Sequence, residues 1–142
     1  MAVVVFDSDV LIGFLNASDA HHADAVRLVR DSLAPGTRRM LSAVNYSEIL
    51  IGPIKAGKQA RDHVDAMLGH FSIEVMIVDK AFAVRAAAVR ARTDLKLPDA
   101  YALATALHAE KSGHEEIRLE SFDRRVVKAY TDLHPSSSDS QS

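Results

Sequence analysis

Four acidic residues, Asp7, Glu48, Asp99 and Asp123, stand in unusual settings. Asp7 and Asp123 follow the apolar runs VVVF and IRLESF, Glu48 lies within SAVNYSEILIG, and Asp99 opens a segment rich in Ala and Leu. A carboxylate against apolar surface is costly unless a partner compensates its charge. Converging carboxylates also repel one another, which raises their pKa values. A bound cation removes both costs, and all-oxygen ligands suit Mg²⁺ or Mn²⁺ rather than zinc.

The elements that must position these acids alternate along the chain. Apolar runs predict strands, and helical spacing with breaks at Pro and Gly predicts helices between them. We expect strands at residues 3–6, 40–42, 73–78 and 117–122, and helices at residues 10–15, 20–33, 44–53, 58–71, 80–93, 98–111 and 124–130. Such alternation predicts an α/β layered fold around a parallel sheet.

Parallel sheets form sites at the carboxyl ends of their strands, near the point where the strand order reverses. Asp7 and Asp123 both stand directly after a predicted strand. If those two strands are neighbours, the two carboxylates face each other at one edge of the sheet.

The composition sets the frame. The chain of 142 residues is long enough for one domain, and its net charge of -2 gives no overall basic field. The lack of cysteine excludes disulfides and thiolate metal sites. The N-terminal apolar run is too short for a signal peptide or a membrane span, so we expect a cytoplasmic protein without membrane contact. We expect a domain over residues 1–134 and a disordered polar, Ser-rich tail over residues 135–142.

Each acid also has a purely structural interpretation. Asp7, Asp9 or Asp123 could cap the helix that follows it. Asp99 in a first helical turn gains from the helix dipole. Glu48 shares a helix face with apolar residues, yet it could be partly exposed or paired with an arginine. The spacing alone leaves these interpretations and a metal site open.

Four motifs occur in a characteristic order: an apolar strand leading into DSDVLIGFL, then SAVNYSEIL, then LKLPDAYALATAL, and last a strand ending in ESFDRRV. In these motifs the chain resembles the PIN-domain nucleases, and specifically the VapC-type toxins of bacterial toxin–antitoxin pairs. The resemblance runs over residues 3–127. It implies a three-layer PIN-like fold with a central parallel sheet of four to five strands and helices on both faces.

The resemblance also implies roles for individual residues. The four acids would form a catalytic quartet that holds Mg²⁺ (or Mn²⁺), with Asp7 and Asp99 as the most direct ligands. Asp9 and Ser121 would have supporting roles, since Ser121 stands where the family often has threonine. The family sheet usually ends with a fifth strand after the last short helix, and here only YTDLHP remains before the polar tail.

The implied function is that of a Mg²⁺-dependent endoribonuclease toxin, neutralised by a cognate VapB-type antitoxin and forming a homodimer. The carboxylates would fix one or two metal ions that activate water against an RNA phosphodiester bond. Family resemblance supplies RNA as the substrate and a 5′-phosphate as the product. Lys96, Arg124 and Arg125 are candidate phosphate contacts, although each could also be an ordinary solvated cation.

Two other functions remain open at this stage. FDSDVL also resembles the first motif of haloacid-dehalogenase-type phosphatases, in which Asp7 would be the nucleophile and Asp9 the acid. That family usually has Gly-Thr where this chain has Val10 and Leu11. The third possibility is a catalytically silent PIN-like scaffold that binds RNA or protein, and the intact quartet argues against it.

Overall fold

The protein contains a parallel four-stranded sheet. A computed structural model describes residues 1–113 and 116–133. Its strands are β1 (Ala2–Phe6), β2 (Thr37–Ser42), β3 (Ile73–Met76) and β4 (Glu116–Glu120), in the spatial order β3-β2-β1-β4. All three pairings are parallel. The α/β class with a central parallel sheet, predicted from the sequence, is confirmed.

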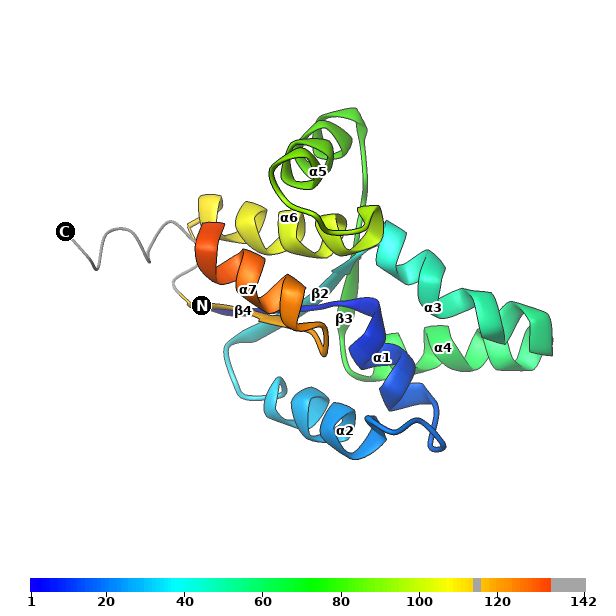
Figure 1. Ribbon diagram of the computed structural model, residues 1–142. Coiled ribbons are helices and arrows are strands. Elements are labelled where there is room, and N and C mark those ends of the chain that lie inside the picture. Colours follow the sequence, from blue (N-terminus) through cyan, green and yellow to red (C-terminus); the bar gives the residue numbers. More distant parts are fainter. Residues whose placement is uncertain (114–115, 134–142) are drawn as a thin grey trace.

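Helices cover both faces of this sheet (Figure 1). Those that the structure describes are α1 (Ser8–Leu15), α2 (His22–Asp31), α3 (Ala43–Ala56), α4 (Lys58–His70), α5 (Lys80–Arg92), α6 (Leu97–Lys111) and α7 (Arg124–Leu133). The first four pack mainly on one face and the last three on the other. The molecule is therefore built in three layers, as the family resemblance implies. None of the helices in the described part of the chain is long and apolar enough to cross a membrane.

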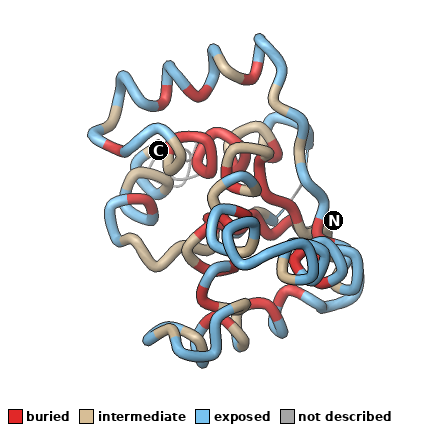
Figure 2. Tube along the Cα trace, turned by 90° about the vertical axis from the view of Figure 1, so that its right-hand side faces the viewer, coloured by how far each residue is buried: buried red, intermediate tan, exposed pale blue. Residues whose placement is uncertain are grey.

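The central strand β1 is buried on both faces, which explains its unbroken apolar sequence. Val3 and Val5 pack with α5, α6 and α7, whereas Val4 and Phe6 pack with α1 to α4. All four side chains are at most 1% exposed. Figure 2 shows this burial concentrated along the centre of the molecule. A strand so enclosed holds the residue at its end in a fixed position.

The strand order reverses at β1. This strand lies between β2 and β4, so the crevice beyond the carboxyl ends of β1 and β4 is the switch point of the sheet. The pairing of β1 with β4 continues past Phe6, since the backbone N–H of Asp7 donates to the carbonyl of Glu120 at 2.9 Å. The expectation that the strands before Asp7 and Asp123 are neighbours is confirmed.

Several predicted boundaries were wrong. Helix α3 continues through Pro53 to Ala56 and ends before Gly57, which has φ +125°. β3 stops at Met76, and Ile77, expected within the strand, is 85% exposed. α2 begins at His22 rather than at residue 20, and β2 begins at Thr37 rather than at residue 40.

The C-terminal part of the chain was the least certain from the sequence. α7 extends to Leu133, so most of the segment considered for a fifth strand is helical. Within residues 1–113 and 116–133, no strand follows α7. The predicted disordered tail, residues 135–142, lies outside the described residues.

Candidate functional site

Asp7 forms the floor of the candidate site at the end of β1. Its side chain is 1% exposed and both of its oxygens are hydrogen-bonded. Oδ1 accepts from the backbone N–H of Ser8 at 2.8 Å, and Oδ2 accepts from Ser121 Oγ at 2.9 Å. Burial, and then the nearby charges of Asp9 and Asp99, raise its pKa to about 7. Asp7 also occupies the cap position of α1, so the structural interpretation holds alongside the functional one.

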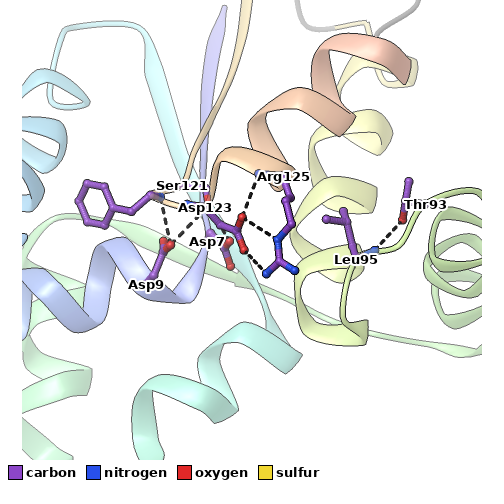
Figure 3. Close-up of polar contacts among 8 residues, drawn as sticks. Asp7, Asp9, Thr93, Leu95, Ser121, Asp123 and Arg125 are labelled. Carbon is purple, nitrogen blue, oxygen red and sulfur yellow. Dashed lines mark hydrogen bonds and ion pairs between the residues drawn. The ribbon is translucent and has the colours of Figure 1, made fainter.

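Asp9 lies beside Asp7 and is held by the segment that follows β4 (Figure 3). Its Oδ2 accepts from the backbone N–H of Phe122 at 3.0 Å and from Ser121 Oγ at 3.4 Å. Its Oδ1 is buried and has no hydrogen-bond partner among the described residues. Burial, with a smaller contribution from Asp99, raises the pKa of this carboxyl. Ser121 thus links Asp7 and Asp9, in keeping with the supporting role expected for it.

Glu48 reaches the site from α3. Its Oε1 accepts from Ser8 Oγ at 2.7 Å and from Asn45 Nδ2 at 3.2 Å. The sequence placed Glu48 on an apolar helix face together with Val44 and Ile51, and this was wrong. Ile51 is 57% exposed, and the contacts of Glu48 are polar because this side chain lies beside Ser8, at the start of α1, and Asn45.

Asn45 joins α3 to α6 and is fully buried. Its Nδ2 donates to the carbonyl of Pro98 at 3.0 Å as well as to Glu48. Its Oδ1 accepts from Ser42 Oγ at 2.7 Å, while its own N–H donates to that same oxygen at 3.1 Å. Since Pro98 immediately precedes Asp99, this side chain fixes two of the four acids relative to each other.

Asp99 is the electrostatic centre of the cluster. It lies half-buried in the first turn of α6. Its pKa is raised by burial and then by the charges of Asp123 and Glu48, against the smaller opposing effects of Arg125 and Lys96. Because Asp99 also raises the pKa of Asp7 and Asp9, it interacts with every other acid of the site.

Asp123 stands at the rim, just after β4. It is bound by Arg125 through the backbone N–H at 2.9 Å, Nε at 3.2 Å and Nη2 at 3.0 Å. These hydrogen bonds lower the pKa of Asp123. Of the three candidate phosphate contacts, Arg125 is paired with Asp123. Lys96 is exposed, but its charge lowers the pKa of Asp99 and Asp123. Arg124 is exposed.

The structure brings all four predicted acids to one edge of the sheet. Sequence reasoning missed Ser8, Asn45 and the backbone N–H of Phe122, which hold the carboxylates in place. Asn45 carried one usable signal, because Ser42 stands two residues before a predicted helix and Asn45 stands three residues after Ser42, where a capping partner binds. Ser8 and Phe122 carried none, since only the fold brings them to their partners.

The residues present fit a hydrated divalent cation. The donors are carboxylate oxygens of the kind that Mg²⁺ and Mn²⁺ prefer, and Asp9 contributes a buried oxygen without a partner. Among the described residues, no three acidic or imidazole side chains converge closely enough to enclose an ion by themselves. Mg²⁺ requires no such enclosure, because it usually keeps several waters and binds one or two carboxylates directly.

The family of the chain follows from comparison with known proteins. Residues 4–132 match the PIN domain family, so the chain belongs to that family and the predicted resemblance is confirmed. Comparison with curated proteins returned no match.

Solved structures of similar fold include three toxin proteins or complexes. Mycobacterium tuberculosis VapC20, a toxin that cleaves the sarcin-ricin loop, is 22% identical with a TM-score of 0.64, over 91% of this chain and 95% of that one. A toxin–antitoxin complex from Klebsiella pneumoniae is 22% identical with a TM-score of 0.66, over 94% and 93%. VapBC-1 from nontypeable Haemophilus influenzae is 15% identical with a TM-score of 0.65, over 94% and 95%. At these identities the likeness concerns the fold.

Proposed function

We propose that this protein is a metal-dependent endoribonuclease toxin of a type II toxin–antitoxin pair. The observation that carries the proposal is Asp7, an acid that is 1% exposed at the switch point of a PIN-domain sheet, with other acids near enough to raise its pKa. A buried carboxylate among like charges is costly unless a cation binds there. The fold neighbours that are toxins support the same function.

Asp7, Glu48, Asp99 and Asp123 would hold Mg²⁺ or Mn²⁺, with Asp9 in support. When bound, the cation would supply an activated water and offset the negative charge of the scissile phosphate. The chain itself contributes orientation: Ser121 and the backbone of Ser8 fix Asp7, so its oxygens keep one direction. Both oxygens of Asp7 accept hydrogen bonds, which makes the carboxylate a poorer nucleophile, and this supports its assignment as an ion ligand over a phosphatase nucleophile.

A VapB-type antitoxin and a homodimer complete the proposal. Matched structures from Klebsiella pneumoniae and Haemophilus influenzae are toxin–antitoxin complexes, and another is VapBC2 from Rickettsia felis bound to a DNA fragment from its promoter. We place the activity in the cytoplasm, where RNA is the accessible polyanion.

The test is cleavage of total cellular RNA by the purified protein, with mapping of the ends produced. Reactions contain Mg²⁺, Mn²⁺ or EDTA, and use wild type, Asp7→Asn, Asp99→Asn and the control Asp31→Asn, an exposed acid on α2. We expect metal-dependent cuts that leave 5′-phosphates, a loss of about 100-fold or more in the two site variants, and normal activity in the control. Equal cutting by every preparation would identify a contaminant.

The same preparations separate the alternatives. Release of p-nitrophenol from p-nitrophenyl phosphate by wild type, without RNA cleavage, would indicate a phosphatase. RNA binding without cleavage and without Mn²⁺ binding in calorimetry would indicate a silent scaffold.

A further inference from the structure

A groove remote from the acids lies between α5 and α6, near the end of α7. It has a volume of about 280 Å³. α5 and α6 lie side by side on one face of the sheet, and α7 lies next to α6 (Figure 1). Four of its lining side chains are basic: Arg85, Arg92, His108 and Lys111. We call it the α5–α6 groove.

The charged side chains that line the α5–α6 groove are all basic. No carboxylate lines it among the described residues, although the whole chain has a net charge of -2. Arg85, Arg92 and Lys111 are exposed, and none of them forms an ion pair with an acid in the described part of the chain. Cations gathered without acids repel one another, so an anionic occupant would be stabilised there.

His108 forms a hydrogen bond with Arg85 at the α5–α6 groove. Its Nδ1 lies 2.8 Å from Arg85 Nη1. Because a guanidinium can only donate, Nδ1 is the acceptor and the ring proton is on Nε2. The ring is also held by an edge-to-face contact with Phe82, with centroids 5.9 Å apart. The hydrogen bond with Arg85 and the ring contact with Phe82 thus fix the side chain of His108 beside the exposed cations of the groove.

The groove continues toward the catalytic acids. A second groove of about 370 Å³ shares Arg92 and Leu133 with the first, and its lining includes Arg125. Arg125 binds Asp123 of the acid cluster. The second groove also contains Lys128, which is paired with Asp132 at 2.8 Å, and a second acid, Asp94, so its charge is mixed. Arg92 and Arg125 thus mark a path from the rim of the site to the α5–α6 groove.

The floor of the α5–α6 groove is apolar. Val89, Leu107 and Leu133 contribute to it, together with Ala88 and Ala104. A single RNA strand can use this combination, because its phosphates contact cations while its sugars contact aliphatic side chains; no aromatic side chain for base stacking lines the groove among the described residues. A purely electrostatic anion site would need no such floor.

We propose that the α5–α6 groove binds the phosphodiester backbone of single-stranded RNA several nucleotides away from the cut. The proposal rests on the ribonuclease function proposed above and adds a substrate-binding site to it. An acidic protein segment could satisfy the same charges, but continuity with the catalytic acids through Arg92 and Arg125 favours the substrate itself. Lys111, Arg85 and Arg92 are then binding residues, not catalytic ones.

The first test measures binding in EDTA, where no cleavage occurs. Fluorescence anisotropy compares wild type with the triple variant Arg85→Gln, Arg92→Gln, Lys111→Gln on single-stranded RNAs of about 6 and about 20 nucleotides. The matched control is Arg27→Gln, Arg30→Gln, Lys55→Gln, which removes the same charge from α2 and α3. We expect the groove variant to bind the long RNA 10- to 100-fold more weakly, with a salt slope smaller by about 2. Control binding changes little.

The second test measures cleavage. With Mg²⁺ present, the groove variant should show a raised KM for the long RNA, an unchanged kcat, and unchanged cleavage of the short RNA. Equal binding and cleavage of the long RNA by the groove and control variants would overturn the proposal while leaving the ribonuclease intact. Weaker binding of a poly-glutamate peptide together with unchanged RNA binding would overturn it in favour of an acidic protein partner. Failure of the ribonuclease proposal would give a different result, because the wild-type protein would then cleave neither RNA in the presence of metal.

Discussion

Asp7 and Asp123 follow neighbouring strands, yet the pKa values of their carboxyl groups are shifted in opposite directions. Asp7 is 1% exposed, and burial among like charges raises its pKa to about 7. Asp123 has a side chain that is 25% exposed and paired with Arg125, which lowers its pKa. Equivalent positions in a sheet bring the two acids to one edge, but solvent and local partners decide their charge.

The site consequently has a floor and a rim with different chemistry. The floor, Asp7 and Asp9, is rigid and carries its charge at a cost. The rim, Asp123 with Arg125, is ionised without a metal. Substitutions in the floor should therefore change how stability depends on pH, whereas substitutions in the rim should mainly change the affinity for metal.

The largest effect is expected from Asp7→Asn in metal-free protein. Between pH 4 and pH 7 the folded protein holds a proton on Asp7 that the unfolded chain has released, so wild-type stability falls as pH rises through this window. An amide carries no such cost, and we expect the variant to be more stable by about 4 kcal/mol at pH 8 and nearly equal near pH 4. Urea unfolding in EDTA across this range measures the difference. Parallel curves for the two proteins would contradict the assigned ionisation of the floor.

The second effect concerns the connection between α3 and α6. Asn45→Ala removes a donor to the part-buried carbonyl of Pro98 and the acceptor of the buried Ser42 hydroxyl, so we expect a loss of about 2–3 kcal/mol in the free energy of unfolding. Asn16→Ala, which removes an exposed capping amide, is the control and should cost about 1 kcal/mol or less. Chemical denaturation of both variants provides the comparison, and equal losses would argue against a special role for Asn45.

Ser121→Ala removes the link between the floor and the segment after β4. Asp7 Oδ2 and the N–H of Asp123 both lose a partner, and we expect a loss of about 1 kcal/mol in stability. The pKa of Asp7 should rise further, because the Ser121 hydrogen bond lowers it. Ser121→Thr keeps the hydroxyl and should behave as wild type in the same urea and pH measurements. If threonine fails to restore the wild-type values, packing rather than the hydrogen bond is responsible.

The smallest effect on stability is expected at the rim. Arg125→Gln breaks an exposed ion pair, so unfolding should change by about 1 kcal/mol or less. Freed of its cation, Asp123 adds negative charge to the site, and we expect Mn²⁺ to bind several-fold more tightly in calorimetry. Arg124→Gln, at an exposed neighbouring position, is the control. Equal tightening in both variants would mean that only the total charge matters.

The sequence predicted the fold class and the meeting of the acids because both depend on local patterns. VVVF before Asp7 and IRLESF before Asp123 identify strands, and parallel strands place their ends together. The α6 helix was likewise predictable from Pro98 in its first turn and Gly113 just beyond its end.

The parts that the sequence could not predict depend on contacts between distant segments. The hydrogen bond from Ser8 to Glu48 joins residues 40 apart, and that from Asn45 to Pro98 joins residues 53 apart. The sequence alone does not reveal that Ser8 pairs with Glu48 or that Asn45 pairs with Pro98. The extension of α3 past Pro53 could not be predicted from the local sequence either, because a proline usually ends a helix.

The bond between Ser121 and Asp7 spans 114 positions of the chain. The carboxyl end of β1 is thus completed by β4, and Asp7 gains its second hydrogen-bond partner only when β4 has joined the sheet. A ribosome synthesising this protein would have to release Asp123 from its tunnel before the acid cluster could assemble. If these acids form the active site proposed above, the order of translation keeps the nascent chain inactive until that point.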